Sequence, residues 1–246
     1  MSFRDNIKKL FLTGKETDPK IGYDLWSAEY DNQPGNLMLD LDKEIFSSLL
    51  KETSLDGKVI ADVGCGTGRH WSLILAQQPT RLAGYDTSTG MLEKLREKYP
   101  GAETYLTTDH HMPGLEDRSC DLIVSTLTIA HIENIKGAFR EWERVIKKDG
   151  EIILTDYHPV ALSKGARRTF RYRGKTIAVK NHIYPTDMIR GLLEQLGFRM
   201  IRFSERSIDD SVKSYYEQQH ALALFERFKG VPVIYGMFLK KINDPV

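Results

Sequence analysis

The chain has 246 residues, of which 41% are hydrophobic, and its formal net charge at pH 7 is +1. This composition supplies a packed core, and the balanced charge argues against a globally basic nucleic-acid-binding protein. The longest apolar runs, residues 122–132 and 231–239, are too short to cross a bilayer, and the first residues lack a signal-type apolar core. With two cysteines outside any disulfide framework, we expect a cytoplasmic protein built as one elaborated α/β domain.

The sequence of residues 1–36 predicts helices. Residues 1–20 are predicted to form a short helix followed by a loose linker. Residues 22–36 place Tyr23 and Tyr30 seven positions apart on one face of a potential helix, with Trp26 between them. The spacing fits an amphipathic helix that packs its aromatic side chains on the core.

The most informative stretch is residues 59–71. It begins with an apolar run, residues 59–63, that predicts a buried strand, and the strand runs into a turn with Gly64, Gly66 and Gly68. Glycine permits backbone angles that a Cβ forbids, and it lets a ligand approach the main chain closely. We therefore interpret the turn as a binding site for a nucleotide-like ligand.

The spacing of the glycines disfavours a dinucleotide. In the G-x-G-x-x-G pattern the third glycine comes one residue later than here, where Arg69 stands. The carboxylate of Asp62 would repel a pyrophosphate and attract a cationic amino-acid ammonium. Asp86 ends the next predicted strand at about the spacing expected for a carboxylate that binds ribose hydroxyls. An NAD-dependent oxidoreductase is the alternative that these residues leave open.

The rest of the chain alternates between strand and helix patterns, as in an α/β fold. Further helices are expected after Ser88 and after Pro185. The other strands expected are residues 81–86, 103–106, 120–125, 151–155, 199–207 and 233–240, and the other helices are residues 37–50, 71–78, 135–148 and 212–228.

Residues 157–184 form an inserted cap with a predicted β-hairpin around Gly174. Its cations would either hold an anionic substrate or nucleic acid, or form a solvated charged surface. These cations are Lys164, Arg167, Arg168, Arg171, Arg173, Lys175 and Lys180.

Histidines are the candidate general bases, because they titrate near neutral pH. His131, His158 and His182 are predicted at the rim over the strand ends, and we rank the last two first because they belong to the cap. His110 and His111 suggest a metal site, but adjacent imidazoles point apart in an extended chain and no further ligand stands at metal spacing. We therefore predict no metal centre.

Four stretches resemble motifs of the class I S-adenosylmethionine (SAM) methyltransferases, in particular of their small-molecule, UbiE-like group. Asp62 and the three glycines match motif I at every place. Residues 23–31 are similar to the Tyr-Asp-x-Trp-Ala-x-x-Tyr-Asp lid segment, and residues 86–92 are similar to the Asp-x-Ser-x-x-Met-Leu run. Residues 144–156 resemble the helix, turn and strand that follow, with Asp149 where the family usually has proline.

The resemblance implies a Rossmann-like seven-stranded sheet of order 3-2-1-4-5-7-6, with strand 7 antiparallel and helices on both faces. The single domain, residues 1–246, would have a core at about residues 55–156 and 185–241. A lid and cap would come from residues 1–54, 157–184 and 209–230.

The resemblance also implies transfer of the SAM methyl group to a small-molecule acceptor, with S-adenosylhomocysteine as product. Residues 125–128 lack the motifs of nucleobase methyltransferases, so nucleic acid is a disfavoured partner. Two alternatives remain, a non-catalytic SAM-binding regulator and an RNA methyltransferase that uses the basic hairpin. The cofactor-binding residues implied are Tyr23, Tyr30, Asp62, Gly64, Cys65, Gly66, Gly68, Asp86, Thr87, Met91, Asp109 (to the adenine amino group), His110 and Thr126.

Overall fold

The computed structural model describes residues 15–242. Its centre is a seven-stranded sheet in the order β4-β3-β2-β5-β6-β10-β9, in which β10 runs antiparallel to both neighbours. Counted in chain order, this arrangement reads 3-2-1-4-5-7-6, and the α/β architecture expected from the sequence is confirmed. The strands are β2 (Val59–Val63), β3 (Arg81–Asp86), β4 (Glu103–Leu106), β5 (Cys120–Thr126), β6 (Ile146–Tyr157), β9 (Phe198–Ser207) and β10 (Pro232–Lys241).

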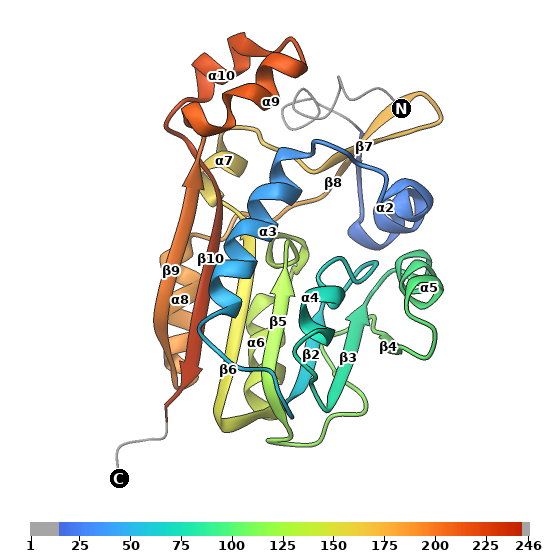
Figure 1. The fold of residues 1–246 in the computed structure, drawn as a ribbon, viewed down its shortest axis with the longest axis vertical. Coiled ribbons are helices and arrows are strands. Elements are labelled where there is room, and N and C mark those ends of the chain that lie inside the picture. Colours follow the sequence, from blue (N-terminus) through green and yellow to red (C-terminus); the bar gives the residue numbers. More distant parts are fainter. Residues whose placement is uncertain (1–14, 243–246) are drawn as a thin grey trace.

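Helices cover both faces of the sheet (Figure 1). Their apolar residues fall into two buried clusters, one on each face, because the central strands are buried on both sides. One face is covered by α3 (Leu37–Leu50), α4 (Trp71–Leu75) and α5 (Thr89–Lys98), and the other by α6 (Ile135–Val145) and α8 (Thr186–Gln195).

A second, three-stranded sheet forms a cap over the strand ends. The predicted hairpin is confirmed as β7 (Thr169–Tyr172) and β8 (Lys175–Val179), and β1 (Lys15–Thr17) pairs with β8 in parallel. The linker predicted up to residue 20 is therefore wrong, because this segment pairs as a strand and α2 (Pro19–Trp26) follows at once. The short helix predicted before it falls largely on residues 1–14, outside the described residues.

The cap and the lid share a small aromatic core. The lid is α2 with the 3-10 turn η2 (Ser27–Glu29) and Tyr30. The ring of Trp26 stacks on that of Phe170 in the hairpin, with centroids 4.8 Å apart. Trp26, Tyr30, Met91, Phe170 and Val179 are buried together. Lid, hairpin and the start of α5 thus pack as one apolar unit.

Three helix predictions are wrong in extent. The helix expected over residues 212–228 is broken into η4 (Asp210–Val212), α9 (Lys213–Gln218) and α10 (Leu222–Phe228), with His220 between them at a left-handed φ of 51°. The helices expected to reach residues 78 and 148 end at 75 and 145. After the first, Gln78 adopts a left-handed φ of 56°, and after the second the chain enters β6 directly.

Two short elements were not predicted, η3 (Ile129–His131) after β5 and α7 (Pro159–Ser163) after β6. Both stand beside the cap, at the end of the sheet where the parallel strands finish (Figure 1). Within residues 15–242, no helix has the length and apolar character needed to span a membrane.

Candidate cofactor and active site

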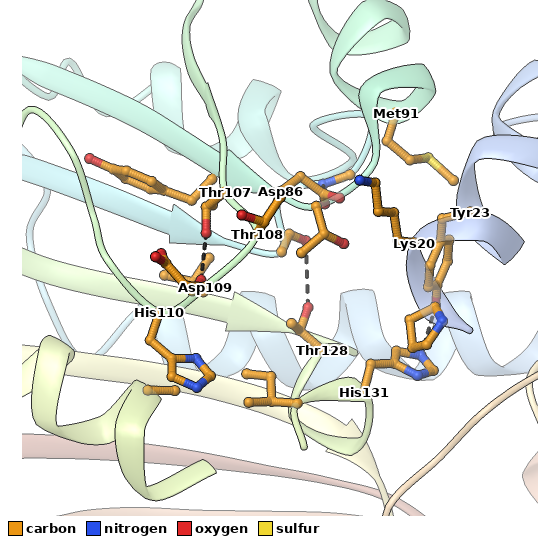
Figure 2. A pocket seen from close by; sticks show the side chains of 18 of the residues that line it. Lys20, Tyr23, Asp86, Met91, Thr107, Thr108, Asp109, His110, Thr128 and His131 are labelled. Carbon is orange, nitrogen blue, oxygen red and sulfur yellow. Dashed lines mark hydrogen bonds between the residues drawn. The ribbon is translucent and has the colours of Figure 1, made fainter. Parts of the chain in front are cut away.

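A cavity of about 800 Å³ lies at the carboxyl ends of β2, β3 and β5. Open α/β sheets bind ligands at this edge, where the strand order reverses on either side of the first strand. Figure 2 shows Asp109 and His110 at one end of the cavity and Tyr23 and His131 at the other. The predicted site residues that line it are Tyr23, Tyr30, Gly64, Gly66, Asp86, Thr87, Met91, Asp109, His110, Thr126 and His131.

The three glycines of the turn all have left-handed φ angles, and each meets a different neighbour. A Cβ on Gly64 (φ 73°) would lie 2.1 Å from Oγ1 of Thr128, so only glycine lets the loop after β5 approach. A Cβ on Gly66 (φ 53°) would have nothing within 4 Å, so the main chain there faces open space. Gly68 (φ 70°) packs under the side chains of α4 and α5. The turn therefore fits a ligand pressed against Gly66.

Asp86 connects the end of β3 to this turn. Its Oδ2 accepts from the backbone N–H of Gly66 (2.8 Å), and its Oδ1 accepts from that of Ser88 (2.9 Å). Burial raises the pKa of Asp86, against the lowering effect of these backbone hydrogen bonds. Two carboxylate oxygens offer about four acceptor positions, so one remains on each for a hydroxyl of a ligand.

Three residues expected to bind the cofactor lie behind the cavity wall. Asp62 is 4% exposed and its Oδ2 accepts from Nε1 of Trp71 (2.8 Å), so the side chain faces α4 instead of the cavity. Burial raises the pKa of Asp62 to about 7. Cys65 is buried against Gly84, and Gly68 against Leu95. None of the three lines the cavity.

The other end of the cavity holds a tyrosine–histidine pair. Nδ1 of His131 lies 2.9 Å from the carbonyl oxygen of Lys180, and since a carbonyl accepts, the ring proton is assigned to Nδ1. Nε2 is then an acceptor, and the hydroxyl of Tyr23 donates to it over 2.9 Å. Burial lowers the pKa of His131 to about 4 and raises that of Tyr23 well above its ordinary value. Both groups are neutral at pH 7.

Known proteins resemble this chain in sequence and in fold. A family model described as a methyltransferase domain matches residues 61–154. The chain is 30% identical over 144 residues to a ubiquinone/menaquinone biosynthesis C-methyltransferase of Campylobacter jejuni, a match that covers 56% of this chain and 54% of that protein. It is 33% identical over 117 residues to a malonyl-acyl-carrier-protein O-methyltransferase of Hamiltonella defensa, covering 47% and 44%. The chain thus spans about half the length of the curated relatives it matches, or less.

A solved structure agrees at the level of the fold. The S-adenosylmethionine dependent methyltransferase from Mesorhizobium loti superimposes with a TM-score of 0.62 at 18% identity, covering 81% of this chain and 98% of that one. The chain thus resembles SAM-dependent methyltransferases in sequence over residues 61–154 and in its fold.

Two of the three candidate bases lie away from the cavity. His158 caps α7, where its Nδ1 accepts from the backbone N–H of Val160 (3.2 Å) and its Nε2 lies 3.5 Å from a carboxylate oxygen of Glu205. His182 is half-buried, with its ring stacked on that of Tyr184. Neither lines the cavity, whereas His131 does. The predicted ranking, which placed the cap histidines first, is therefore reversed.

Hydrogen bonds tie the lid to the loops that carry the cofactor motifs. Oδ1 of Asp24 accepts from the hydroxyl of Ser88 (2.6 Å) and from the backbone N–H of Gly90 (3.0 Å). Asp31, just after the lid, accepts from the hydroxyl of Thr67 (2.7 Å) and from Nζ of Lys98 (2.8 Å). The position of Tyr23 and Tyr30 over the cavity thus depends on the same segments that present Gly66 and Asp86.

Sequence reasoning missed several wall residues. Lys20 lines the cavity from the first turn of α2, in a segment expected to be a linker. Thr128 also lines the cavity, on the loop after β5 that packs closely against Gly64. Thr107 and Thr108 line it beside Asp109. Their position directly after predicted strands was the available signal, because the carboxyl ends of parallel strands meet at one edge.

Proposed function

We propose that this chain transfers the methyl group of SAM to a small-molecule acceptor. The observation that carries the proposal is one cavity that joins Gly66 and Asp86 at one wall to Tyr23 and His131 at another. Gly66 and Asp86 suit the binding of a nucleoside, and Tyr23 and His131 suit contact with the reacting group of the acceptor. The similarity to methyltransferases supports the same chemistry. We assign the class of acceptor from the residues of the cap.

We propose that the nucleoside lies along the strand ends. Asp86 would accept the ribose hydroxyls with the acceptor positions that Gly66 and Ser88 leave open, since those two donors occupy one position on each oxygen. Met91 and Asp109, both in the cavity wall, would flank the base. The main chain at Gly66 would lie against the ligand, where a side chain would otherwise stand.

When bound, SAM supplies an electrophilic methyl group on a sulfonium sulfur. The contribution of the chain would then be alignment and exclusion of water, because charge is dispersed as the methyl moves. Tyr23 and Tyr30 on the lid close the cavity over the strand ends. If the acceptor must lose a proton, the oxygen of Tyr23 would take it while the phenolic proton passes to Nε2 of His131.

The proposal is tested by binding and by product release. Titration calorimetry with SAM, S-adenosylhomocysteine and NAD separates this function from an oxidoreductase, and binding of NAD alone would contradict it. Incubation with SAM and a metabolite extract, followed by detection of S-adenosylhomocysteine, separates an enzyme from a SAM-binding regulator. The same assay with RNA in place of the extract tests the basic hairpin as an RNA surface.

We also propose a division of the chain into a cofactor-binding core and an acceptor-selecting lid and cap. Tyr23 and Tyr30 of the lid support it, because both line the cavity together with residues of the strand ends. A cytoplasmic location is proposed from the thiols of Cys65 and Cys120, which are both free and buried.

A further inference from the structure

Arg168, which directly precedes β7, is buried within the cap. It is 4% exposed, although the sequence suggested a solvated basic hairpin. Aromatic rings surround its guanidinium, whose central carbon lies between 5.6 and 5.8 Å from the ring centres. These rings belong to Tyr23, Trp26, Tyr30 and Tyr157, which together we call the aromatic cage.

The hydrogen-bonding capacity of this guanidinium is largely unused. Nη2 donates to the hydroxyl of Tyr30 (2.5 Å), while Nε and Nη1 have no hydrogen-bond partner among the described residues. The neighbouring carboxylate, Asp156, uses Oδ2 to accept from the backbone N–H of Ala130 (2.6 Å) and Oδ1 to accept from that of Tyr157 (2.6 Å). A buried cation without a hydrogen-bonded counter-ion is destabilising, so its retention points to a ligand.

The charge balance favours a singly charged anion. Arg69, a second arginine whose charge acts on this region, is paired with the buried carboxylate of Asp42. Arg168 is thus left with one positive charge and free N–H groups, which suits a carboxylate better than a doubly charged phosphate. The aromatic rings around it suit an apolar or aromatic body next to that carboxylate.

The cage adjoins the proposed active site. The rings of Tyr23 and Tyr30 both contact Arg168, and both residues also line the cavity. Tyr23 lies at the end that holds His131 (Figure 2), and the ring of Tyr30 is 6.1 Å from that of Tyr23. A group bound by Arg168 would therefore lie beside the Tyr23–His131 pair, away from Asp109. Because Arg168 is buried, its ligand would enter when the lid moves outward and releases the contacts of Asp24 with α5.

We propose that Arg168 binds the carboxylate of the methyl acceptor, and that the acceptor is a small apolar or aromatic carboxylic acid. This proposal rests on the proposed function, because it places the anion in the acceptor half of the same site. Arg168 acts as a specificity determinant: its free N–H groups hold the acid, and the aromatic cage encloses the body of the molecule.

The test compares an acid with its uncharged counterpart. Binding of 3-phenylpropanoate and of 3-phenylpropanamide is measured by calorimetry, with and without S-adenosylhomocysteine, on the wild type, Arg168→Met and Lys175→Met. Lys175 is the matched control, since it is an exposed cation on the same hairpin. We expect the wild type and Lys175→Met to bind the acid and not the amide, and Arg168→Met to lose about tenfold or more in affinity for the acid.

The two proposals fail in different ways. Absence of S-adenosylhomocysteine binding with intact acid binding contradicts the proposed function alone. Equal affinity of the wild type for acid and amide, no affinity for the acid, or unchanged acid binding in Arg168→Met overturns the carboxylate site.

Thermal unfolding checks that the variants fold. Arg168→Met should melt no lower than the wild type, because it removes a buried charge that lacks a counter-ion; a large fall in melting temperature would instead mark Arg168 as a structural residue. Should that variant not fold, Arg168→Lys keeps the charge with fewer donors, and it must weaken acid binding without changing the affinity for S-adenosylhomocysteine. Retention of full acid affinity in Arg168→Lys would count against the proposal.

Discussion

The hydroxyl of Tyr23, on the lid, donates a hydrogen bond to Nε2 of His131, which follows β5. This contact joins a lid residue to the sheet edge across the cavity. If it relays a proton, Tyr23→Phe should lower kcat by about a hundredfold with little change in the affinity for SAM. The double variant with His131→Asn should lose no more than the single variants, because the two residues act as a unit.

The controls for this relay are the pH profile and a half-buried tyrosine of the hairpin, Tyr172, which does not line the cavity. Tyr172→Phe on the outer hairpin should retain full rate. Since burial lowers the pKa of His131 to about 4, its NMR titration should show no protonation step near pH 6.5. The folded pKa lies below the unfolded value, so the stability that His131 contributes should be lost as the pH falls from about 6.5 through 4. Full kcat in both Tyr23→Phe and His131→Asn would exclude the relay.

Asp86→Ala should weaken SAM binding by at least about tenfold, because ribose hydroxyls would lose a charged acceptor. Calorimetry measures the change. Asp149→Ala, which removes an exposed carboxylate near the other end of β6, serves as the control and should bind normally. Asp86→Ala also leaves the backbone N–H groups of Gly66 and Ser88 without their acceptor, so the melting temperature of this variant must be measured in parallel. Unchanged affinity would mean that Asp86 has a purely structural role.

Asp42→Asn should be one of the most destabilising single changes in the chain. The carboxylate is fully buried and accepts from Nη2 of Arg69, a ring nitrogen of His70 and the hydroxyl of Thr155. Loss of its charge should lower the free energy of unfolding by about 3–5 kcal/mol, measured by denaturant titration. Asp40→Asn, exposed on the same helix, should change it by less than about 0.5 kcal/mol.

The same carboxylate predicts a loss of stability in acid. Buried Asp42 has a pKa below its ordinary value because the charge of Arg69 and the hydrogen bonds from His70 and Thr155 outweigh desolvation. A depressed folded pKa contributes stability that is present above the unfolded value and is lost as the pH falls below it. The pH dependence of unfolding below about pH 4 should therefore be weaker in Asp42→Asn than in the wild type.

Asp62→Asn should have the opposite dependence on pH. Burial raises the pKa of Asp62 to about 7, so its contribution to stability is greatest in acid and declines as the pH rises through 7. The variant should therefore be more stable than the wild type at pH 8 and similar at pH 4, with a slope difference of up to about 1.4 kcal/mol per pH unit between. Denaturant titrations across this range measure it. Equal slopes in both proteins would mean that Asp62 is ionised throughout.

The core strands could be predicted from sequence because their signals are local. The bounds of β2, β3 and β4 are those predicted from the sequence. The glycine turn and Asp86 could be found from spacing alone, since their positions relative to those strands are fixed by the fold. What was missed depends on distant contacts. The strand at residues 15–17 exists because β8 lies beside it, and no pattern of three residues encodes that pairing.

The orientation of site residues could not be predicted for the same reason. Asp62 turns from the cavity because the indole of Trp71 supplies a donor on its other side. His131 has its ring fixed by the carbonyl of Lys180, a residue 49 positions away. The burial of Arg168 depends on four rings from two other segments of the chain, the lid and the end of β6. In each case, the orientation or burial of the side chain is determined by a contact with a residue from another segment of the chain.

The reversed direction of β10 has an evolutionary consequence. Because β10 runs antiparallel between β6 and β9, the segment that leads into it, residues 209–230, enters from the same edge at which β6 ends and the cap begins. A change in the length of either segment would fall at this one edge, without shifting the hydrogen-bonded strands beneath. Exchange of these edge loops could thus give such a scaffold a different acceptor without altering the glycine turn.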